Sequence, residues 1–531
     1  MAKNLQRGVA AGDRGIFQRL HSARLLLWWS AAWAIGVFAL APLMNYVTPF
    51  LDQSYANQWT PDVYWRLVLY WHGAIFIPWI VVLAVLVTCR FHLDETDGMP
   101  GRLIRESVFV GGFLAVPIAG VAGIFDVYDQ FALGIPLWTQ IFAFLIGDEI
   151  AISLLVAMIA FPRSHGGYMK AGMPFYTVLI GVAGALTAAM LGHVGGYITW
   201  FGPNPSIVNQ YINSTMYPVL GYSNSSSIIM FTEDVVGSHS HLMMVALMAG
   251  VVALVAMLFG GYETWGKNTR RVANVGFAVM IVALLTALWM YVVSGVGNYQ
   301  IPSFFVNGVN GVAGDDLTTG TVGLGAVFVL GALLAESRRR LTAGGTPFFR
   351  DALFVSVIVA WITIYLVIPV TGFYINFNET FYQAAGLNFD DAFLRFHQDF
   401  GFFVLPAIVT MALALDFQGI SGRARNAVGY LFMGGTGIAF VFGEVYALGN
   451  LSDWAYYLAW FGGFVIGTGV AVGVYYLARA SAGRGRMAVE IPASREGETG
   501  GVCARAEFED RPPSGADMEP LPESTGRSED R

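Results

Sequence analysis

The chain has 531 residues, of which 56% are hydrophobic and only 12% are charged, and its formal net charge is −7. Soluble globular domains carry about 25% charged residues, so this composition excludes an ordinary soluble protein and predicts a membrane protein. The two cysteines, Cys89 and Cys503, are too far apart in the sequence to form a paired metal or redox motif. Covalent haem attachment is excluded as well, because no C-x-x-C-H sequence is present.

Residues 1–23 form a polar, basic cytoplasmic segment without the features of a secretory signal. A membrane-spanning helix needs about 20 mostly apolar residues. The segments that satisfy this criterion are 24–48, 64–89, 104–126, 137–162, 172–200, 240–260, 272–296, 318–336, 350–374, 397–416, 425–448 and 454–478. None of them alternates in the manner of a membrane β-barrel strand. The sequence therefore predicts an all-α polytopic membrane bundle of about twelve helices within residues 24–479.

Basic residues predict the orientation of this bundle. They gather in alternate connections between the predicted helices, at Arg90, Arg102, Arg105, Arg163, Lys170, Lys267, Arg270, Arg271, Arg338, Arg339, Arg340, Arg350, Arg423, Arg425, Arg479, Arg484 and Arg486. The opposite connections hold only Arg66 and Arg395. Because Lys and Arg mark cytoplasmic loops, both termini are expected in the cytoplasm, and a prokaryotic inner membrane is the expected location. Residues 480–531 are polar and are predicted to form a disordered cytoplasmic tail.

Five of the eight histidines are predicted to share one layer of the membrane. The helices that begin near 64, 240 and 397 run inward, and the helix that ends near 200 runs outward. The histidines that fall in the outer part of these helices are His72, His193, His239, His241 and His397. Ionisable side chains at this depth are costly and usually face the bundle interior. The gathering of all five in one layer favours ligation of haem or metal by imidazole. The alternative is a set of unrelated histidines that hydrogen-bond between helices or face an aqueous vestibule.

Short motifs on two of these helices resemble the large subunit of haem–copper oxidases and nitric oxide reductases. The second helix reads Tyr70-Trp71-His72-Gly73-Ala74, which is similar to the family's His-Gly pair, whose histidine binds the low-spin haem. The tenth reads Arg395-Phe396-His397 and keeps the second histidine of the family's His-Phe-His motif. The resemblance implies that His72 and His397 are the two axial ligands of one low-spin haem b.

The chain departs from that family in the residues that form the family's copper centre and in an arginine pair. The family's copper takes ligands from the sixth and seventh helices, but no histidine occurs between His241 and His397. The family's arginine pair after the eleventh helix is also missing from the stretch between Leu448 and Asp453. We therefore expect no copper centre of the usual kind. A second site formed by His193, His239 and His241 is predicted to bind a second haem or a metal.

Two carboxylates, Glu233 and Asp234, precede His239 in the sequence, and two interpretations of this stretch are open. Glu233 or Asp234 could orient an imidazole by hydrogen bonding, in the way that carboxylates behind metal ligands do. The alternative is that Ser238 caps the sixth helix, in which case His239 and His241 belong to an ordinary helix start.

Three further carboxylates lie within predicted spans. Asp148 and Glu149 occur in the fourth helix and Glu444 in the eleventh. Intramembrane acids are candidates for a proton path or a cation site, and the alternative is an interhelical hydrogen bond by a protonated acid.

The sequence as a whole favours a haem-b-binding redox subunit of a respiratory membrane. Its expected partners are the lipid bilayer and either other redox subunits or a quinol or cytochrome donor, and no basic face suggests nucleic acid. The second hypothesis is a secondary transporter or ion channel that uses the intramembrane acids and histidines. No clear similarity between the two halves of the chain supports the internal repeats that many transporters have.

Overall fold

The computed structural model describes residues 22–47, 72–96, 98–128, 135–164, 167, 171–201, 226–297, 314–342, 350–367, 405–448 and 453–482. Throughout these ranges the regular secondary structure is helical, and no strand is found in them. The prediction of an all-α bundle is therefore confirmed for the part of the chain that the structure describes.

Each of the twelve segments predicted from hydropathy contains helix. The main elements in chain order are α2 (Ala23–Val47), η2 (His72–Phe76), α5 (Ile77–Phe91), α6 (Met99–Ile104), η4 (Arg105–Gly111), α7 (Gly112–Tyr128), α8 (Ile135–Ser164), α9 (Met173–Phe201), α12 (Ser226–Leu258), α13 (Lys267–Gly297), α15 (Gly314–Thr342), α16 (Ala352–Ile362), η9 (Thr363–Val367), α20 (Leu405–Phe417), α21 (Gly422–Leu448) and α22 (Asp453–Ser481).

Eight helical stretches among the described residues are long and apolar enough to cross a membrane. They are Met99–Ile124, Trp138–Pro162, Met173–Val194, His241–Leu258, Lys267–Met290, Thr318–Arg340, Gly422–Tyr446 and Trp454–Ser481. Four shorter apolar helices accompany them, at Ala23–Val37, Ile77–Phe91, Ala352–Tyr365 and Ile408–Phe417. The chain is thus a helical membrane protein, while the number of spans and the side of the termini stay predictions.

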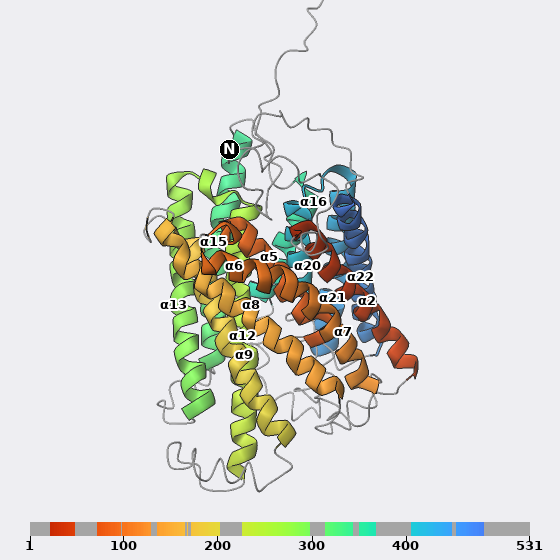
Figure 1. Cartoon of the computed structure of the whole chain (residues 1–531). Coiled ribbons are helices and arrows are strands. Elements are labelled where there is room, and N and C mark those ends of the chain that lie inside the picture. Colours follow the sequence, from red (N-terminus) through yellow and green to blue (C-terminus); the bar gives the residue numbers. More distant parts are fainter. Residues whose placement is uncertain are drawn as a thin grey trace, which may run out of the picture.

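The helices run mostly along one long axis (Figure 1). Extensive contacts join α9 to α12, α13 to α15 and α21 to α22, so helices close in sequence pack as pairs. The first and last described helices also meet, because Ser481 Oγ donates a hydrogen bond to the backbone carbonyl of Arg24 at 2.9 Å. Helix α13 lies on one side of the bundle, and α2 and α22 lie on the opposite side (Figure 1).

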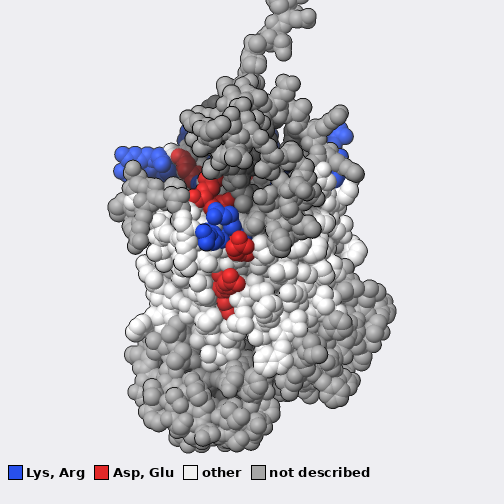
Figure 2. All heavy atoms as spheres, viewed as in Figure 1, with Lys and Arg blue, Asp and Glu red and all other residues white. Residues whose placement is uncertain are grey.

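Charged side chains are concentrated toward one end of the bundle. Figure 2 shows them in the upper part of the viewed face, above a broad band without charge, onto which a short file of acidic and basic side chains descends. We call this the basic end, because it carries the described arginines of the connections predicted to be cytoplasmic, among them Arg90, Arg271, Arg339 and Arg425.

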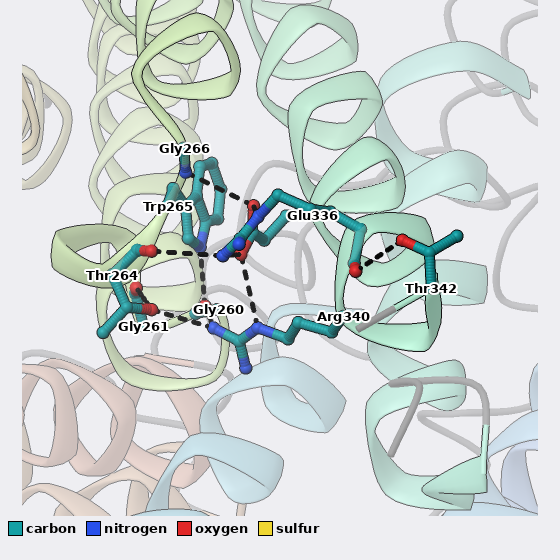
Figure 3. A network of polar contacts seen from close by, with 9 residues as sticks. Gly260, Gly261, Thr264, Trp265, Gly266, Glu336, Arg340 and Thr342 are labelled. Atoms are coloured by element: carbon teal, nitrogen blue, oxygen red, sulfur yellow. Dashed lines mark hydrogen bonds and ion pairs between the residues drawn. The ribbon is translucent and has the colours of Figure 1, made fainter. Parts of the chain in front are cut away.

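Two networks tie helices together at the basic end. In the first, Glu336 of α15 has no exposed side-chain surface and is held by Arg339 through two contacts of 2.5 and 2.8 Å. Arg340 donates to the carbonyl of Gly260 at 3.1 Å and to Thr264 Oγ1 at 3.0 Å (Figure 3). The end of α15 is thereby fastened to the connection between α12 and α13.

The second network joins α16, α20 and α21. Arg425 of α21 contacts Asp351 Oδ2 at 2.6 Å and Asp416 Oδ1 at 2.8 Å. Asp351 also caps α16, since its Oδ1 accepts from the backbone nitrogens of Leu353 and Phe354 at 3.1 and 3.3 Å. One carboxylate therefore satisfies a helix start and an arginine at the same time.

Helix α12 differs from its predicted extent. It begins at Ser226, whereas hydropathy placed the start of the sixth span at 240. Ile228, Ile229 and Phe231 supply apolar residues that continue the helix beyond the predicted span. At about 1.5 Å per residue, its 33 residues extend about 50 Å, which exceeds the hydrocarbon thickness of a bilayer. The alternative in which Ser238 caps this helix is therefore wrong, because Ser238 lies well inside it.

Among the described residues, three short stretches are π-helical. They are η2, η4 and η9, and each continues directly into or out of an α-helix. The wider π-turn is rare and often marks functional positions in proteins. Here η2 carries His72 and η4 carries Ser107, while Tyr365 of η9 donates a hydrogen bond to the carbonyl of Met248 in α12 at 2.8 Å.

Candidate functional site

Three of the predicted histidines lie at the same height in the bundle. Nineteen residues separate His72 from the end of α5 and His239 from the end of α12, and twenty separate His193 from the start of α9. At about 1.5 Å per residue, each histidine is roughly 30 Å from the basic end of its helix. The prediction that these side chains share one layer, far from the basic end, therefore agrees with the helix bounds.

His72 and His239 face one another across the space between η2 and α12. Their ring centroids are 6.1 Å apart and the ring planes are 20° from parallel. Phe76 and Phe144 also border the imidazole of His72, with centroids at 5.0 and 5.6 Å. The two histidines come from segments that are more than 160 residues apart in the chain, so only the packing of the helices brings them together.

The orientation of His239 is fixed by helix α9. Its Nδ1 lies 2.7 Å from the backbone carbonyl of Ala188. A carbonyl oxygen only accepts hydrogen bonds, so Nδ1 carries the proton and Nε2 of the neutral ring keeps its lone pair. This arrangement, with Nδ1–H held by a carbonyl, is typical of imidazoles that bind a metal through Nε2.

Gly192 makes room for that imidazole. A Cβ atom at this position would lie 2.7 Å from His239 Nδ1 and 2.8 Å from Cε1, so only glycine permits the observed approach. Gly192 also stands four residues after Ala188, on the same face of α9, and its missing side chain leaves the carbonyl of Ala188 accessible. The helix surface is therefore shaped to receive His239.

His193 forms an ion pair or hydrogen bond with a carboxyl group from the neighbouring helix. Its Nε2 lies 2.6 Å from Asp148 Oδ2 of α8, and the side chains are 29% and 10% exposed. Phe144, one turn before Asp148, contacts both His193 and His72, with ring centroids at 6.5 and 5.6 Å. The four residues His72, His193, His239 and Asp148, with Phe144 between them, form what we call the histidine cluster.

The histidine cluster combines residues from the two sites that the sequence predicts. The first predicted site is a haem held by His72 and His397, and the second is formed by His193, His239 and His241. The structure places His72 beside His239, while His397 lies outside the described residues, so the pairing of His72 with His397 stays a prediction. His241 follows His239 by two residues in α12 and points about 200° away from it around the helix axis. Glu233 and Asp234 lie in the same helix, and their side chains are outside the described part.

The three predicted intramembrane acids differ in direction. Asp148 is buried and points to His193. Glu149, the next residue, points about 100° away from Asp148 around the axis of α8. It is exposed and accepts a hydrogen bond from Ser107 Oγ of η4 at 3.0 Å. Ser153 Oγ in turn donates to Ser107 Oγ at 2.8 Å. Glu444 is half-buried on α21. The proton path through all three acids stays a prediction. Of the three acids, only Asp148 contacts a histidine among the contacts described.

Sequence reasoning missed the residues that orient the cluster. The carbonyl of Ala188, the space left by Gly192 and the ring of Phe144 belong to apolar helix stretches, where no pattern distinguishes them from neighbouring residues. Gly73 is a partial exception, because it belongs to the His-Gly pair that resembles the motif of the haem–copper family. A Cβ atom there would lie 2.1 Å from the carbonyl oxygen of Ala119, so Gly73 lets η2 approach α7 directly after His72.

The imidazoles of the histidine cluster could hold a cofactor that needs only one or two protein ligands. Within the described ranges, no three His, Cys, Asp or Glu side chains converge closely enough to hold a metal ion by themselves. Haem needs only one or two protein ligands, because the porphyrin supplies the other nitrogens. Comparison with protein-family models, curated proteins and solved structures finds no match to this chain.

Proposed function

We propose that this chain is a haem-b-binding redox subunit of a respiratory membrane, in which His72 and His239 would hold the haem. The proposal includes the twelve-span topology with both termini in the cytoplasm, a prokaryotic inner membrane as its location, and a quinol, a cytochrome or another redox subunit as electron donor. The sequence resemblance to the large subunits of haem–copper oxidases and nitric oxide reductases points to the same class.

The observation that carries this proposal is the geometry of the facing pair. The ring centroids of His72 and His239 are 6.1 Å apart and the ring planes are 20° from parallel, so two imidazoles from distant parts of the chain lie close enough to hold one group. The hydrogen bond from His239 Nδ1 to the Ala188 carbonyl leaves Nε2 as the ligating atom. A haem held in this way would supply reversible one-electron transfer.

The chain's own residues have distinct roles in this proposal. Ala188 and Gly192 hold the imidazole of His239 in one tautomer and one orientation. Phe144 contacts the rings of both His72 and His193 with its apolar ring. Asp148 and His193 share a hydrogen bond between Oδ2 and Nε2, next to the facing imidazoles.

Visible spectroscopy of the purified protein, with four histidine variants, tests the proposal. Wild type should show the absorption of a low-spin haem b, and His72→Ala and His239→Ala should each lose most of it. His92→Ala is the matched control, because His92 lies at the basic end with its side chain 53% exposed. If His397→Ala removes the haem and His239→Ala does not, the pairing implied by the resemblance replaces this one. A colourless protein, isolated from cells supplied with haem precursor, would overturn haem binding altogether.

A second function is favoured by one observation, the contact between Asp148 and His193. A carboxyl–imidazole pair inside a membrane bundle is the type of site that proton-coupled transporters and ion channels use. We therefore carry a proton or cation transporter as the alternative. Protein reconstituted in vesicles with a pH-sensitive dye should then conduct protons, and Asp148→Asn should abolish the flux. Glu95→Gln, in the connection after α5 at the basic end, should leave it intact. Proteoliposomes as tight as protein-free vesicles, under either sign of membrane potential, would exclude this alternative.

A further inference from the structure

The exposed face of helix α8 is a single narrow stripe. From Trp138 to Ile159, every exposed side chain falls on positions spaced alternately by four and three residues. These positions are Trp138, Phe142, Leu145, Glu149, Ile152, Val156 and Ile159. The six apolar members are between 38% and 58% exposed. Alternation of four and three is the spacing at which one helix meets another along a left-handed seam.

Glu149 stands at the centre of this stripe and deep within the predicted span. Three apolar members precede it and three follow it. Eleven residues separate it from Trp138 and thirteen from Pro162, so it lies roughly 17–20 Å from either end of the apolar stretch. On the face that α8 crosses in Figure 1, a short file of basic and acidic side chains descends into the uncharged band of Figure 2 and ends in acidic ones. An ionisable group at such depth usually faces protein and not lipid.

The chain itself satisfies only part of this carboxyl group. Ser107 Oγ donates to Oε1 at 3.0 Å and is itself held by Ser153, so one oxygen of Glu149 is fixed in position. Glu149 as a whole residue is exposed on the surface of α8. Lipid chains offer no hydrogen-bonding group at this depth, so burial against lipid alone leaves a polar group without its full set of partners.

We propose that two copies of this chain pack side by side through the α8 stripe, with the carboxyl of Glu149 hydrogen-bonded to Glu149 of the partner subunit. In a membrane, the two-fold axis of such a dimer runs along the membrane normal, so each residue meets its own counterpart at the same depth. A protonated carboxyl group both donates and accepts a hydrogen bond, and it is therefore complementary to a second copy of itself.

A comparison with helix α13 shows why the stripe is more than lipid-facing surface. The exposed members within its span are also apolar, at Val272, Val275, Val282, Leu285 and Trp289. No carboxyl or other ionisable group interrupts that stripe between Val272 and Trp289. Lipid covers such a surface without loss, because lipid tails are as apolar as the side chains. Helix α13 therefore supplies the matched control for α8.

Energy transfer between fluorescently labelled copies in lipid vesicles tests the dimer. Wild type should associate as the protein-to-lipid ratio rises, and Glu149→Leu should weaken association roughly tenfold. Glu149→Gln should retain most of it, because an amide also donates and accepts. Val282→Leu on α13 should change nothing. Cofactor content, measured on the same samples, keeps this result separate from the proposed function.

Cysteine cross-linking locates the contact. In a chain with Cys89 and Cys503 replaced by alanine, Leu145→Cys and Ile152→Cys should form disulfide-linked dimers in membranes, and Val275→Cys and Val282→Cys should not. Three results would overturn the proposal. They are a wild type that stays monomeric at every lipid ratio, a dimer that is unchanged in Glu149→Leu and cross-links through α13, and a monomeric chain that loses a co-purified smaller protein in Glu149→Leu. The last result would assign the stripe to a different subunit.

Discussion

The histidine cluster and the Glu336 network are both built from ionisable side chains on packed helices, but they satisfy those side chains differently. At the basic end, Glu336 is enclosed by Arg339, Arg340 and the backbone of Gly266. The cations keep contact with solvent, since the side chains of Arg339 and Arg340 are 50% and 30% exposed. In the histidine cluster no arginine or lysine takes part in the contacts described, and the groups are imidazoles, one carboxyl and a backbone carbonyl.

The two regions differ in whether their side chains can change their charge near neutral pH. Arginine does not lose its proton under physiological conditions, so the Glu336 network has one charge state and serves to hold α15 against the α12–α13 connection. Imidazole changes its charge or binds a metal near neutral pH. A region made of imidazoles can therefore change state, whereas a region made of guanidinium and carboxylate groups only stabilises. Four substitutions test this contrast, from the largest expected effect to the smallest.

Replacing Glu336 with alanine should have the largest effect on stability. The substitution leaves Arg339 and Arg340 without their buried partner, and loss of one member of a buried pair typically costs about 3–5 kcal/mol. Because both arginines are partly exposed, we expect about 2–3 kcal/mol in the free energy of unfolding, measured by denaturing-detergent titration. Arg338→Ala, on the same turn but exposed, is the control. A change in haem content or proton flux in Glu336→Ala, at retained folding, would contradict the contrast between the two regions.

Gly192→Ala tests the histidine cluster, as Glu336→Ala tests the Glu336 network. The added methyl group overlaps the ring of His239, so overpacking should cost about 2 kcal/mol and displace the imidazole from the Ala188 carbonyl. The visible spectrum should lose the signature of two axial histidines. Gly250→Ala on α12 is the matched control, because a Cβ atom there meets nothing within 4 Å. An unchanged spectrum in Gly192→Ala would show that the orientation of His239 does not matter to the cofactor.

Asp351→Ala should destabilise the chain by about 1–2 kcal/mol, because it removes both the cap of α16 and the contact with Arg425. Asp351→Asn keeps a capping oxygen and should recover roughly half of that loss. Thermal unfolding of the three proteins in one detergent measures the series. Equal destabilisation by the two variants would mean that the ion pair, and not the cap, carries the effect.

Tyr262→Phe should have the smallest effect, about 1 kcal/mol, through loss of the hydrogen bond to Asn274. Burial raises the pKa of the Tyr262 phenol, so its hydroxyl stays protonated and donates at physiological pH. Thermal unfolding at neutral pH should show a small decrease, with an unchanged visible spectrum. A larger loss than that of Glu336→Ala would indicate that the α12–α13 connection depends more on Tyr262 than on the arginines.

Hydropathy predicted the helical bundle well, because lipid imposes one simple requirement on every span. It failed where a helix continues past the apolar layer, as α12 does toward Ser226. It also could not distinguish the two sides of α8. Leu145 and Ile152 face outward and Ile146 and Ile150 face inward, yet all four are apolar, because a membrane protein meets similar chemistry in its core and in the lipid.

The site was predictable only as far as its residue types. A histidine within a span is conspicuous, and so is a pair such as Asp148 and Glu149. Their partners are not, because the proximity of His72 to His239 depends on how η2 packs against α12. The difference of about 100° between the directions of Asp148 and Glu149 follows from helix geometry, but which of them faces the bundle interior depends on the tertiary structure. The Ala188 carbonyl leaves no trace in the sequence at all.

The π-turn that begins with His72 sets the direction of that residue relative to α5. A π-turn contains one residue more than the α-helical turn it replaces. At about 100° per residue, one residue fewer in this turn changes the direction of His72 around the helix axis by about 100°. Deleting one residue between Gly73 and Phe76 should therefore turn His72 away from His239 and leave the packing of α5 as it is.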